Sequence, residues 1–381
     1  MNLAKKLLAV MMNQLSSGLW NETSVVMQHI LDAANTYHTF EGSATRSNMG
    51  ASLSETFKWS GGVLAPNGKI YCVPVNSTDI LIIDPVANTA TRSNIGATLT
   101  GSAKWSGGVL APNGKIYCAP YNSTDILIID PVANTATRSN MGATLTGSAK
   151  WSGGVLAPNG KIYCVPVNST DILIIDPVAN TATRSNIGAT LTGSAKWSGG
   201  VLAPNGKIYC VPDNSTDILI IDPVANTATR SAMGASLSET FKWSGGVLAP
   251  NGKIYCAPYN STDILIIDPV ANTATRSNMG ASLSGSAKCN GGVLAPNGKI
   301  YCVPYSATDI LIIDHVANTA TRSNMGATLT GSAKWSGGVL APNGKIYGIP
   351  SSSSDILIID KNASVPALDI KDCLSPHLNK F

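Results

Sequence analysis

The sequence predicts an all-β fold, a seven-bladed β-propeller with four antiparallel strands per blade, and three observations lead to it. A unit of 46 residues, the distance from Trp59 to Trp105, recurs seven times along the chain of 381 residues. Periods of roughly 40–50 residues are typical of propeller blades and of helical arrays. Each unit holds four short segments rich in β-branched and aromatic residues and shows no helical apolar stripe. The array also starts with a fourth-strand segment, which suits a closed ring.

A tryptophan ends the loop that enters the first strand of nearly every unit. Six units carry it, at Trp59, Trp105, Trp151, Trp197, Trp243 and Trp335, and Cys289 replaces it in the remaining unit. In the first unit the four expected strands are residues 60–65, 69–74, 79–84 and 89–92. The first strand contains two glycines, which suits the crowding of seven strands around one axis. The second and third are apolar on both faces, so neighbouring blades are expected to cover both faces.

Polar residues at the turns predict how the strands connect. Asn67-Gly68 suits a tight hairpin between the first two strands, because both residues tolerate positive φ. Asp84, followed by proline, starts the turn before the fourth strand, and its carboxylate is expected to accept backbone N–H groups there. Asp79 is expected either to cap the start of the third strand or to pair with Arg92.

The register of the units predicts how the ring closes. Residues 44–46 match a fourth strand and precede the first unit, whereas the last unit ends at Asp360 without a fourth strand. We therefore expect residues 45–48 to be the outer strand of the blade that begins at Trp335, because this pairing satisfies backbone groups that an open edge would expose. The predicted domains are an N-terminal helical extension at 1–40, the propeller at 44–365 and a C-terminal tail at 366–381.

Residues 1–40 differ in composition from the repeats. Leu3, Leu7, Met11 and Leu15 form a helical stripe. The apolar run at residues 7–12 is shorter than the hydrophobic region of about 7–15 residues in a secretory signal, and no stretch is long enough to span a bilayer. The segment is therefore predicted to be helical and to dock on the propeller, a partner or a membrane surface.

Cysteines and glycosylation sequons point to different compartments. Six cysteines share one second-strand slot, where adjacent blades are expected to hold them beyond the ~7 Å Cα limit for a disulfide. They are Cys72, Cys118, Cys164, Cys210, Cys256 and Cys302, predicted to be small buried hydrophobes. Unpaired thiols favour a reducing compartment, so the protein is predicted to be cytoplasmic. The alternative is secretion, because Asn-Ser-Thr sequons recur at Asn76, Asn122, Asn168, Asn214 and Asn260.

Charge excludes some partners. Lysine and arginine number 26 against 22 acidic residues, a net charge of +4, and the excess is spread evenly over the repeats. Without a basic run or arm, nucleic-acid binding is not expected. The inner strands contribute serine and glycine and no carboxylate cluster, so neither a metal site nor a cofactor is predicted. We expect a monomer.

The repeat resembles that of a known group of propellers. Its pattern runs Gly-Gly-Val-Leu-Ala-Pro-Asn-Gly-Lys-Ile-Tyr, then Asp-Ile-Leu-Ile-Ile-Asp-Pro-Val-Ala-Asn-Thr-Ala-Thr. It is similar to the repeat of seven-bladed propellers of the streptogramin-lyase-like, NHL and YVTN type, and this resemblance implies the fold but no reaction. Streptogramin lyases use His and Glu on one face. Here His29, His38 and His377 lie outside the repeats and His315 replaces one turn proline, so that catalytic set has no counterpart.

Candidate ligand-binding residues lie on the loop face, the end of the propeller that carries the turns between second and third strands. An exposed tryptophan ring is a platform for sugars or flat apolar ligands, and the alternative is that each tryptophan wedges between blades. Differences between units also cluster on this face. One slot is occupied in turn by Val75, Tyr121, Val167, Asp213, Tyr259, Tyr305 and Ser351. The candidates are therefore the six tryptophans, the three tyrosines and Asp213.

The function predicted is a non-catalytic binding scaffold for protein partners, acting through the loop face. The first alternative is a multivalent glycan-binding propeller. The second is a lyase- or hydrolase-like enzyme built where units differ, at Glu55, Asp213, Glu239 or His315. No catalytic residue is predicted, because polar groups come in sevenfold rings and Asp213 and His315 are expected on opposite faces.

Overall fold

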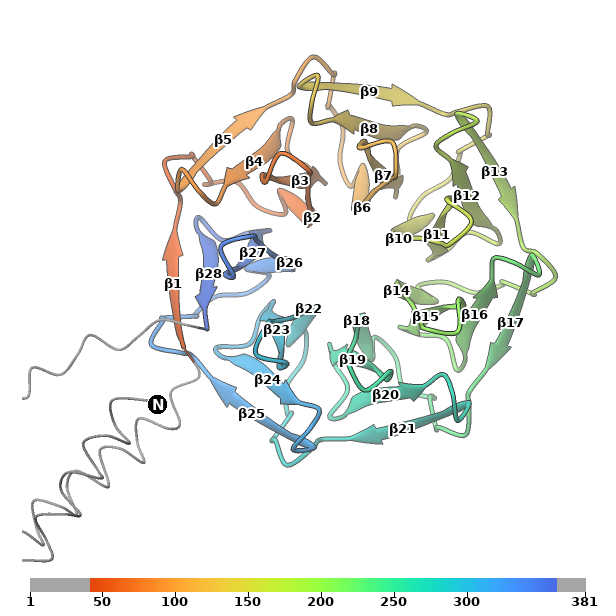
Figure 1. Cartoon of the computed structure of the whole chain (residues 1–381), viewed down its shortest axis with the longest axis vertical. Helices are drawn as coiled ribbons and strands as arrows, with labels where there is room; N and C mark the ends of the chain where they lie inside the picture. Colours follow the sequence, from red (N-terminus) through yellow and green to blue (C-terminus); the bar gives the residue numbers. More distant parts are fainter. Residues whose placement is uncertain (1–41, 362–381) are drawn as a thin grey trace, which may run out of the picture. The chain divides into compact units, whose positions relative to one another are not determined.

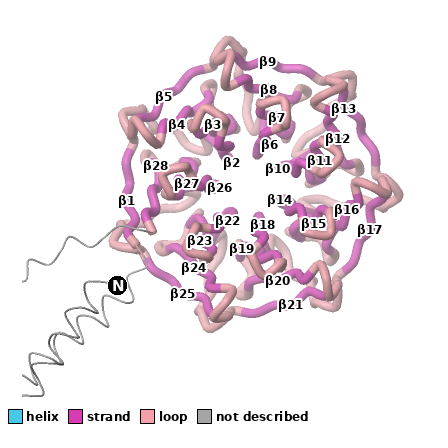
Figure 2. Tube along the Cα trace, in the orientation of Figure 1, coloured by secondary structure: helices cyan, strands magenta, loops and turns pink. Residues whose placement is uncertain are grey.

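The computed structural model describes residues 42–361, and these form a closed ring of seven four-stranded antiparallel sheets (Figure 1). Within the described residues the ring consists of strands and loops, with the sheets arranged like propeller blades around a central axis (Figure 2). The predicted fold class is therefore confirmed. The helical extension expected at 1–40 and the tail expected at 366–381 lie outside the described residues.

Within blades 1 to 6 the strands follow one another from the axis outward, so sheet order equals chain order. Blade 1 consists of β2 (Trp59–Leu64), β3 (Ile70–Pro74), β4 (Ile80–Asp84) and β5 (Thr89–Ser93). Blade 2 consists of β6 (Trp105–Leu110), β7 (Ile116–Pro120), β8 (Ile126–Asp130) and β9 (Thr135–Ser139). Blade 3 consists of β10 (Trp151–Leu156), β11 (Ile162–Pro166), β12 (Ile172–Asp176) and β13 (Thr181–Ser185).

The remaining blades repeat this order. Blade 4 consists of β14 (Trp197–Leu202), β15 (Ile208–Pro212), β16 (Ile218–Asp222) and β17 (Thr227–Ser231). Blade 5 consists of β18 (Trp243–Leu248), β19 (Ile254–Pro258), β20 (Ile264–Asp268) and β21 (Thr273–Ser277). Blade 6 consists of β22 (Cys289–Leu294), β23 (Ile300–Pro304), β24 (Ile310–Asp314) and β25 (Thr319–Ser323). Blade 7 consists of β26 (Trp335–Leu340), β27 (Ile346–Pro350), β28 (Ile356–Asp360) and β1 (Ser43–Ser47).

The middle strands of each blade form the core. Every residue of β3 is buried, and so are the four apolar residues of β4. Apolar side chains cluster between neighbouring blades, and one cluster joins Ile70 and Cys72 of blade 1 to Tyr347 and Ile349 of blade 7. Neighbouring blades thus cover both faces of the two middle strands, as predicted, and the stability of the ring rests on interfaces between adjacent units.

Strand β1 completes blade 7 and closes the ring. It pairs antiparallel with β28, from Ser43 opposite Asp360 to Ser47 opposite Ile356. The Arg46 guanidinium lies 2.9 Å from the Asp355 carboxylate. The predicted closure by an N-terminal strand is therefore confirmed, although the strand begins slightly earlier than the expected 45–48.

A β-bulge shapes each inner strand. In blade 1, Trp59 pairs with Pro74 and Gly62 with Cys72, so two residues of β2 face one residue of β3. Gly61, within the bulge, has φ of 76°, a value that favours glycine. A Cβ would also crowd the next blade, since one built on the equivalent Gly107 lies 2.7 Å from a backbone atom of blade 3. These glycines therefore let the inner strands approach closely at the axis.

The hairpin between the first two strands forms as expected, with positive φ at one of its two turn residues. Gly68 has a positive φ of 78°, but Asn67 does not share it. The reason is Pro66, which fixes a negative φ at the first central position, so the Gly68 N–H donates to the Ala65 carbonyl at 2.9 Å across a turn centred on Pro66 and Asn67. The predicted antiparallel hairpin is confirmed, and of the two residues that tolerate positive φ only Gly68 adopts it.

The turn before the fourth strand agrees with the prediction. The Asp84 Oδ1 atom accepts the N–H groups of Val86 at 3.0 Å and Ala87 at 2.9 Å. Its other oxygen lies 3.3 Å from the Lys69 ammonium. At the opposite end of the blade, Asp79 pairs with Arg92 at 3.1 Å, one of the two roles expected for it.

Candidate functional site

The tryptophan ring is buried. The exposed fraction of each side chain is 0%, for Trp59, Trp105, Trp151, Trp197, Trp243 and Trp335. The Trp59 indole N–H donates to the Asp79 carbonyl at 2.8 Å, and the Arg92 guanidinium lies 5.4 Å from the ring centroid. The indole also packs against residues of blade 7. The hypothesis of an exposed tryptophan platform is therefore wrong, and the alternative of a wedge between blades is confirmed.

A buried lysine, not predicted from the sequence, precedes each of the six tryptophans and also Cys289, which takes the tryptophan position in blade 6. They are Lys58, Lys104, Lys150, Lys196, Lys242, Lys288 and Lys334. The Lys196 ammonium donates to three carbonyls, of Val167 at 2.7 Å, Ser169 at 3.0 Å and Gly193 at 3.1 Å. Burial lowers the pKa of Lys196 to about 8, which leaves it mainly charged at neutral pH. The ammonium groups of the six lysines other than Lys288 therefore fasten a blade to the turn of the preceding blade.

This lysine framework fixes the backbone of the variable slot. The Asp213 N–H donates to the Lys196 carbonyl at 2.9 Å, and the Asp213 carbonyl accepts the Lys242 ammonium at 2.6 Å. Tyr121 is held in the same way between Lys104 and Lys150. Because the backbone is bound on both sides, the side chain at this slot is free to differ from blade to blade.

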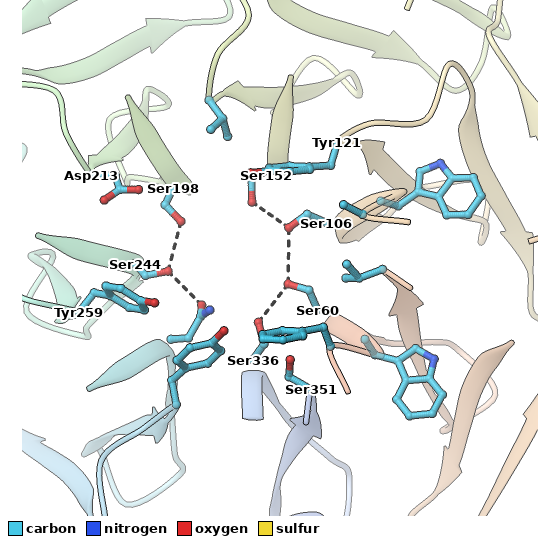
Figure 3. A pocket seen from close by; sticks show the side chains of 18 of the residues that line it. Ser60, Ser106, Tyr121, Ser152, Ser198, Asp213, Ser244, Tyr259, Ser336 and Ser351 are labelled. Atoms are coloured by element: carbon cyan, nitrogen blue, oxygen red, sulfur yellow. Dashed lines mark hydrogen bonds between the residues drawn. The ribbon is translucent and has the colours of Figure 1, made fainter. Parts of the chain in front are cut away.

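Side chains of the slot converge on one cavity of about 320 Å³ at the axis (Figure 3). We name this cavity the cup. Its wall contains the slot residues Val75, Tyr121, Val167, Asp213, Tyr259, Tyr305 and Ser351, together with Phe57 and Phe241 from the loops that enter blades 1 and 5. The sequence analysis placed these tyrosines and Asp213 on one face, and the structure brings them together around a single space.

Serines of the inner strands line the deeper part of the cup. Neighbouring hydroxyls lie 3.0 Å apart for Ser60 and Ser336, and 2.9 Å apart for Ser106 and Ser152. In blade 6 the serine is replaced, and Asn290 accepts a hydrogen bond from Ser244 at 2.9 Å. Figure 3 shows these polar side chains pointing toward the axis from successive blades. The cup therefore combines an aromatic wall with a hydroxyl-lined interior.

Asp213 has the most perturbed environment in the cup. Burial raises the pKa of its carboxyl to about 6, although the Lys242 ammonium acts in the opposite direction. Burial, and secondarily the Asp213 charge, raise the pKa of Tyr121. The rings of Tyr259 and Tyr305 lie with centroids 5.8 Å apart at an interplanar angle of 46°. A carboxyl group among aromatic rings thus makes the cup unlike the sevenfold framework around it.

This raised pKa leads to a stability prediction. Between pH about 4 and 6 the folded protein keeps a proton on Asp213 that the unfolded chain, with an ordinary pKa of 3.8, has released. The free energy of unfolding contributed by this group is therefore expected to fall by about 1–2 kcal/mol as pH rises through this window, allowing for partial exposure.

Denaturant unfolding of the protein and of Asp213→Asn at intervals from pH 4 to 7 measures this effect. The difference between the two isolates Asp213 from the Asp84-type carboxyls, whose pKa values are lowered and which therefore contribute in the opposite direction. A difference that stays constant from pH 4 to 7 would contradict the assignment.

The remaining candidate residues for catalysis do not meet in the cup. His315 lies beside the hairpin glycine Gly298 and packs edge-on against Tyr255 with centroids 6.4 Å apart. Asp213 lies on the opposite, loop face, as predicted. Glu55 and Glu239 pair with Arg92 and Arg276 at 3.0 and 2.8 Å. Within residues 42–361 no group of His, Cys, Asp or Glu side chains is arranged to hold a metal ion.

The described cysteines pack in the interior of the blades, and the sequon asparagines form hydrogen bonds between blades. All cysteines in the described part of the chain are free and buried. The Oδ1 atoms of the sequon asparagines accept a backbone N–H of the next blade, as in the 2.7 Å bond from Ala103 to Asn76. The described residues contain no helix with the length and apolarity needed to span a membrane. The cytoplasmic location stays a prediction.

Comparison with known proteins identifies the fold. No protein-family model matches the chain, and no curated protein matches it in sequence. Virginiamycin B lyase from Staphylococcus aureus matches with a TM-score of 0.65 at 14% identity, over 83% of this chain and 98% of that chain. Hydrazine synthase from Kuenenia stuttgartiensis matches with a TM-score of 0.61 at 15% identity, over 81% of this chain and 97% of that chain.

A third similar structure is an extracellular domain. The extracellular domain of a proposed hybrid two-component system from B. thetaiotaomicron matches with a TM-score of 0.62 at 11% identity, over 85% of this chain and 43% of that chain. The resemblance to streptogramin-lyase-like propellers is thus confirmed at the level of fold. Identities this low carry no activity from one protein to another.

Proposed function

We propose that the protein is a non-catalytic binding protein that engages its partner through the loop face, with the cup as the anchoring point. One observation supports this most directly. In the repeats up to Asp360, the slot after the second strand is the position that takes four residue types, Val, Tyr, Asp and Ser, and its side chains line the cup. A ring of near-identical repeats can fit an asymmetric ligand only where the repeats differ. Here the differences between repeats are concentrated around one cavity.

The chemistry of the cup favours binding over catalysis. A reaction needs groups with unlike pKa values within reach of one another, such as a nucleophile and a base. Asp213 is the acidic side chain in the wall of the cup. The other lining residues are tyrosines, phenylalanines, tryptophans, valines, an alanine, serines and one asparagine, none of which is an acid or a cation. Aromatic walls with a few polar groups are typical of sites that hold a ligand and fix its orientation.

The geometry also separates this proposal from a multivalent glycan-binding propeller. Such a protein needs an equivalent exposed site on each blade, and the repeated tryptophans that were candidates for it are fully buried. The tyrosines occur at the slot in three blades only, and they face one shared cavity. We therefore expect one site per molecule.

A variant without the distinctive slot side chains is expected to lose binding while keeping the fold. It replaces Tyr121, Asp213, Tyr259 and Tyr305 by valine, the residue that occupies the same slot at Val75 and Val167. Screening a library of small aromatic and polar fragments by ligand-observed NMR is expected to give a set of ligands for the protein that this variant no longer binds, with affinities lowered by roughly tenfold or more.

The matched control alters the opposite face. Val132, 84% exposed in the turn between β8 and β9, is replaced by threonine, and this variant is expected to bind the same fragments as the unaltered protein. Unchanged circular dichroism spectra and cooperative thermal unfolding in both variants would establish that the fold is intact. Fragments that bind the valine variant and the unaltered protein equally would place the binding surface elsewhere and refute the role of the cup.

A further inference from the structure

One carboxylate of the propeller has no counter-ion. Among residues 42–361 every other aspartate and glutamate side chain forms a salt bridge with lysine or arginine. Asp213 forms none, and its carboxylate oxygens accept no hydrogen bond from the described residues. A half-buried carboxylate without a partner carries a desolvation cost, which its raised pKa reflects.

The Asp213 carboxylate lies in the wall of the cup, among aromatic side chains. In Figure 3 it faces the axis beside Ser198, with Tyr259 in the next blade and Tyr121 across the cavity. Tyr305 follows Tyr259 around the ring, with its ring centroid 5.8 Å away. The faces of tyrosine rings attract cations, and a carboxylate supplies the negative charge that such a site needs.

The charge of Lys242 acts on Asp213 and lowers its pKa, but none of the lysines near the cup forms a salt bridge with this carboxylate. Lys242 is the nearest to Asp213, but its ammonium is fully buried and donates to the carbonyls of Asp213, Ser215 and Glu239 at 2.6, 3.1 and 2.7 Å. The side chains that line the cup include no lysine or arginine. The described residues therefore leave the Asp213 carboxylate open to a cationic group from outside the chain.

We propose that the cup binds an organic ammonium group, with Asp213 as its counter-ion and the tyrosine rings as its aromatic walls. This inference rests on the proposed function and specifies the ligand of the same site. The cavity of about 320 Å³ is large enough for a compact head group and too small for a folded domain. The ammonium belongs either to a free small molecule or to a lysine-type side chain of a protein partner.

Three probes of similar shape test the charge. Choline is the cation, 3,3-dimethylbutan-1-ol is its neutral analogue and 3,3-dimethylbutanoate is the anion. Titration of the full chain at pH 7.5, followed by NMR or calorimetry, is expected to show that choline binds at least about tenfold more tightly than the neutral analogue, from ion pairing and cation–π contact. The anion is expected to bind more weakly still.

Two variants assign the effect to named residues. Asp213→Asn is expected to weaken choline binding about tenfold and to leave the neutral analogue unchanged, whereas Tyr259→Val weakens both probes. The matched control Asp217→Asn removes a carboxylate of the same blade that pairs with Arg230 at 3.0 Å, and it is expected to change neither. Choline affinity is also expected to fall as pH drops below about 6, where Asp213 gains a proton.

A fourth probe separates the two sources of the ammonium. The probe is trimethyllysine with its α-amino group acetylated and its carboxyl group amidated. It binds more tightly than choline if the natural ligand is a side chain of a protein, and more weakly if the natural ligand is a free small molecule. The proposal is overturned if the neutral or anionic analogue binds as tightly as choline, if Asp213→Asn leaves choline binding unchanged, or if choline does not bind. Fragments that still bind the cup in those cases would leave its binding role standing and remove only the ammonium assignment.

Discussion

Deleting residues 1–48, which removes strand β1, is expected to lower the midpoint of thermal unfolding by about 10 °C and to cause self-association. Strand β1 pairs with β28 along all five of its residues, and Ala44 is buried in a cluster between blades 6 and 7. The Ala44 N–H also donates to the Met325 carbonyl of the neighbouring blade at 2.8 Å. Loss of these contacts is expected to lower the free energy of unfolding by about 5 kcal/mol. In a protein of this size, each kcal/mol lowers the melting temperature by roughly 2 °C.

Self-association follows from the edge that the deletion exposes. Strand β28 carries the apolar sequence Ile356 to Ile359, and without β1 its outer backbone N–H and C=O groups have no partner. An exposed apolar edge strand pairs readily with another chain. Calorimetry and size-exclusion chromatography with light scattering measure the two effects.

The matched control for this prediction is a shorter truncation. Deleting residues 1–41 keeps β1 and is expected to leave the melting temperature and the oligomeric state close to those of the full chain. If the longer truncation melts at the same temperature as the shorter one and stays monomeric, β1 does not close the ring in solution.

The fold was predictable because the repeat encodes it locally. Paired apolar strands and a glycine pair occur in each unit, and an Asp-Pro turn occurs in five of the seven, so every blade specifies the same sheet. Closure was predictable because a fourth-strand segment precedes the first unit, whereas the last unit lacks one. The hairpin was predictable too, but the conformation of its turn was not, because the effect of Pro66 on the first central residue outweighs the preference of Asn67 for positive φ.

The site was less predictable because ring closure, and not the local sequence, assembles it. Tyr121 and Asp213 belong to blades 2 and 4, and only the shared axis brings their side chains to one cavity. The tryptophans were ambiguous from the sequence, since an indole at a loop end suits a ligand platform and a blade interface equally well. In the structure the indole is buried at the blade interface. In blade 1 the Arg92 guanidinium, from the fourth strand, covers the Trp59 ring.

The buried lysines escaped sequence analysis for a related reason. Lysine is rarely buried without partners, so a Lys-Trp pair at a loop end indicates a solvated lysine beside an aromatic residue. The carbonyls that receive the ammonium come from the turn of the preceding blade, about 27 to 29 positions earlier in the chain. Such a partner is visible only when the geometry between blades is known.

Replacing Lys196 by methionine is expected to lower the free energy of unfolding by about 3–5 kcal/mol. Methionine has nearly the same length but no donors, so the carbonyls of Val167, Ser169 and Gly193 lose the ammonium that they share. The Val167 carbonyl keeps the backbone N–H of residue 196, at 3.1 Å, so the carbonyls of Ser169 and Gly193 are the acceptors that lose their donor. A buried acceptor without a donor costs about 1–3 kcal/mol, and water that enters the gap recovers part of this. The lost bonds also join blade 4 to blade 3, so the interface between two units weakens together with the turn.

The control for Lys196 lies in the same blade. Lys207→Met removes an exposed lysine that pairs with Asp222 at 3.3 Å, and surface pairs of this kind contribute about 0–1 kcal/mol. Equilibrium unfolding in urea at pH 7 measures both variants. The chemical change is the same in the two variants, and only the burial of the lysine and its three carbonyl partners differ. If both variants lose the same free energy of unfolding, the Lys196 ammonium stabilises the folded state no more than a surface charge does.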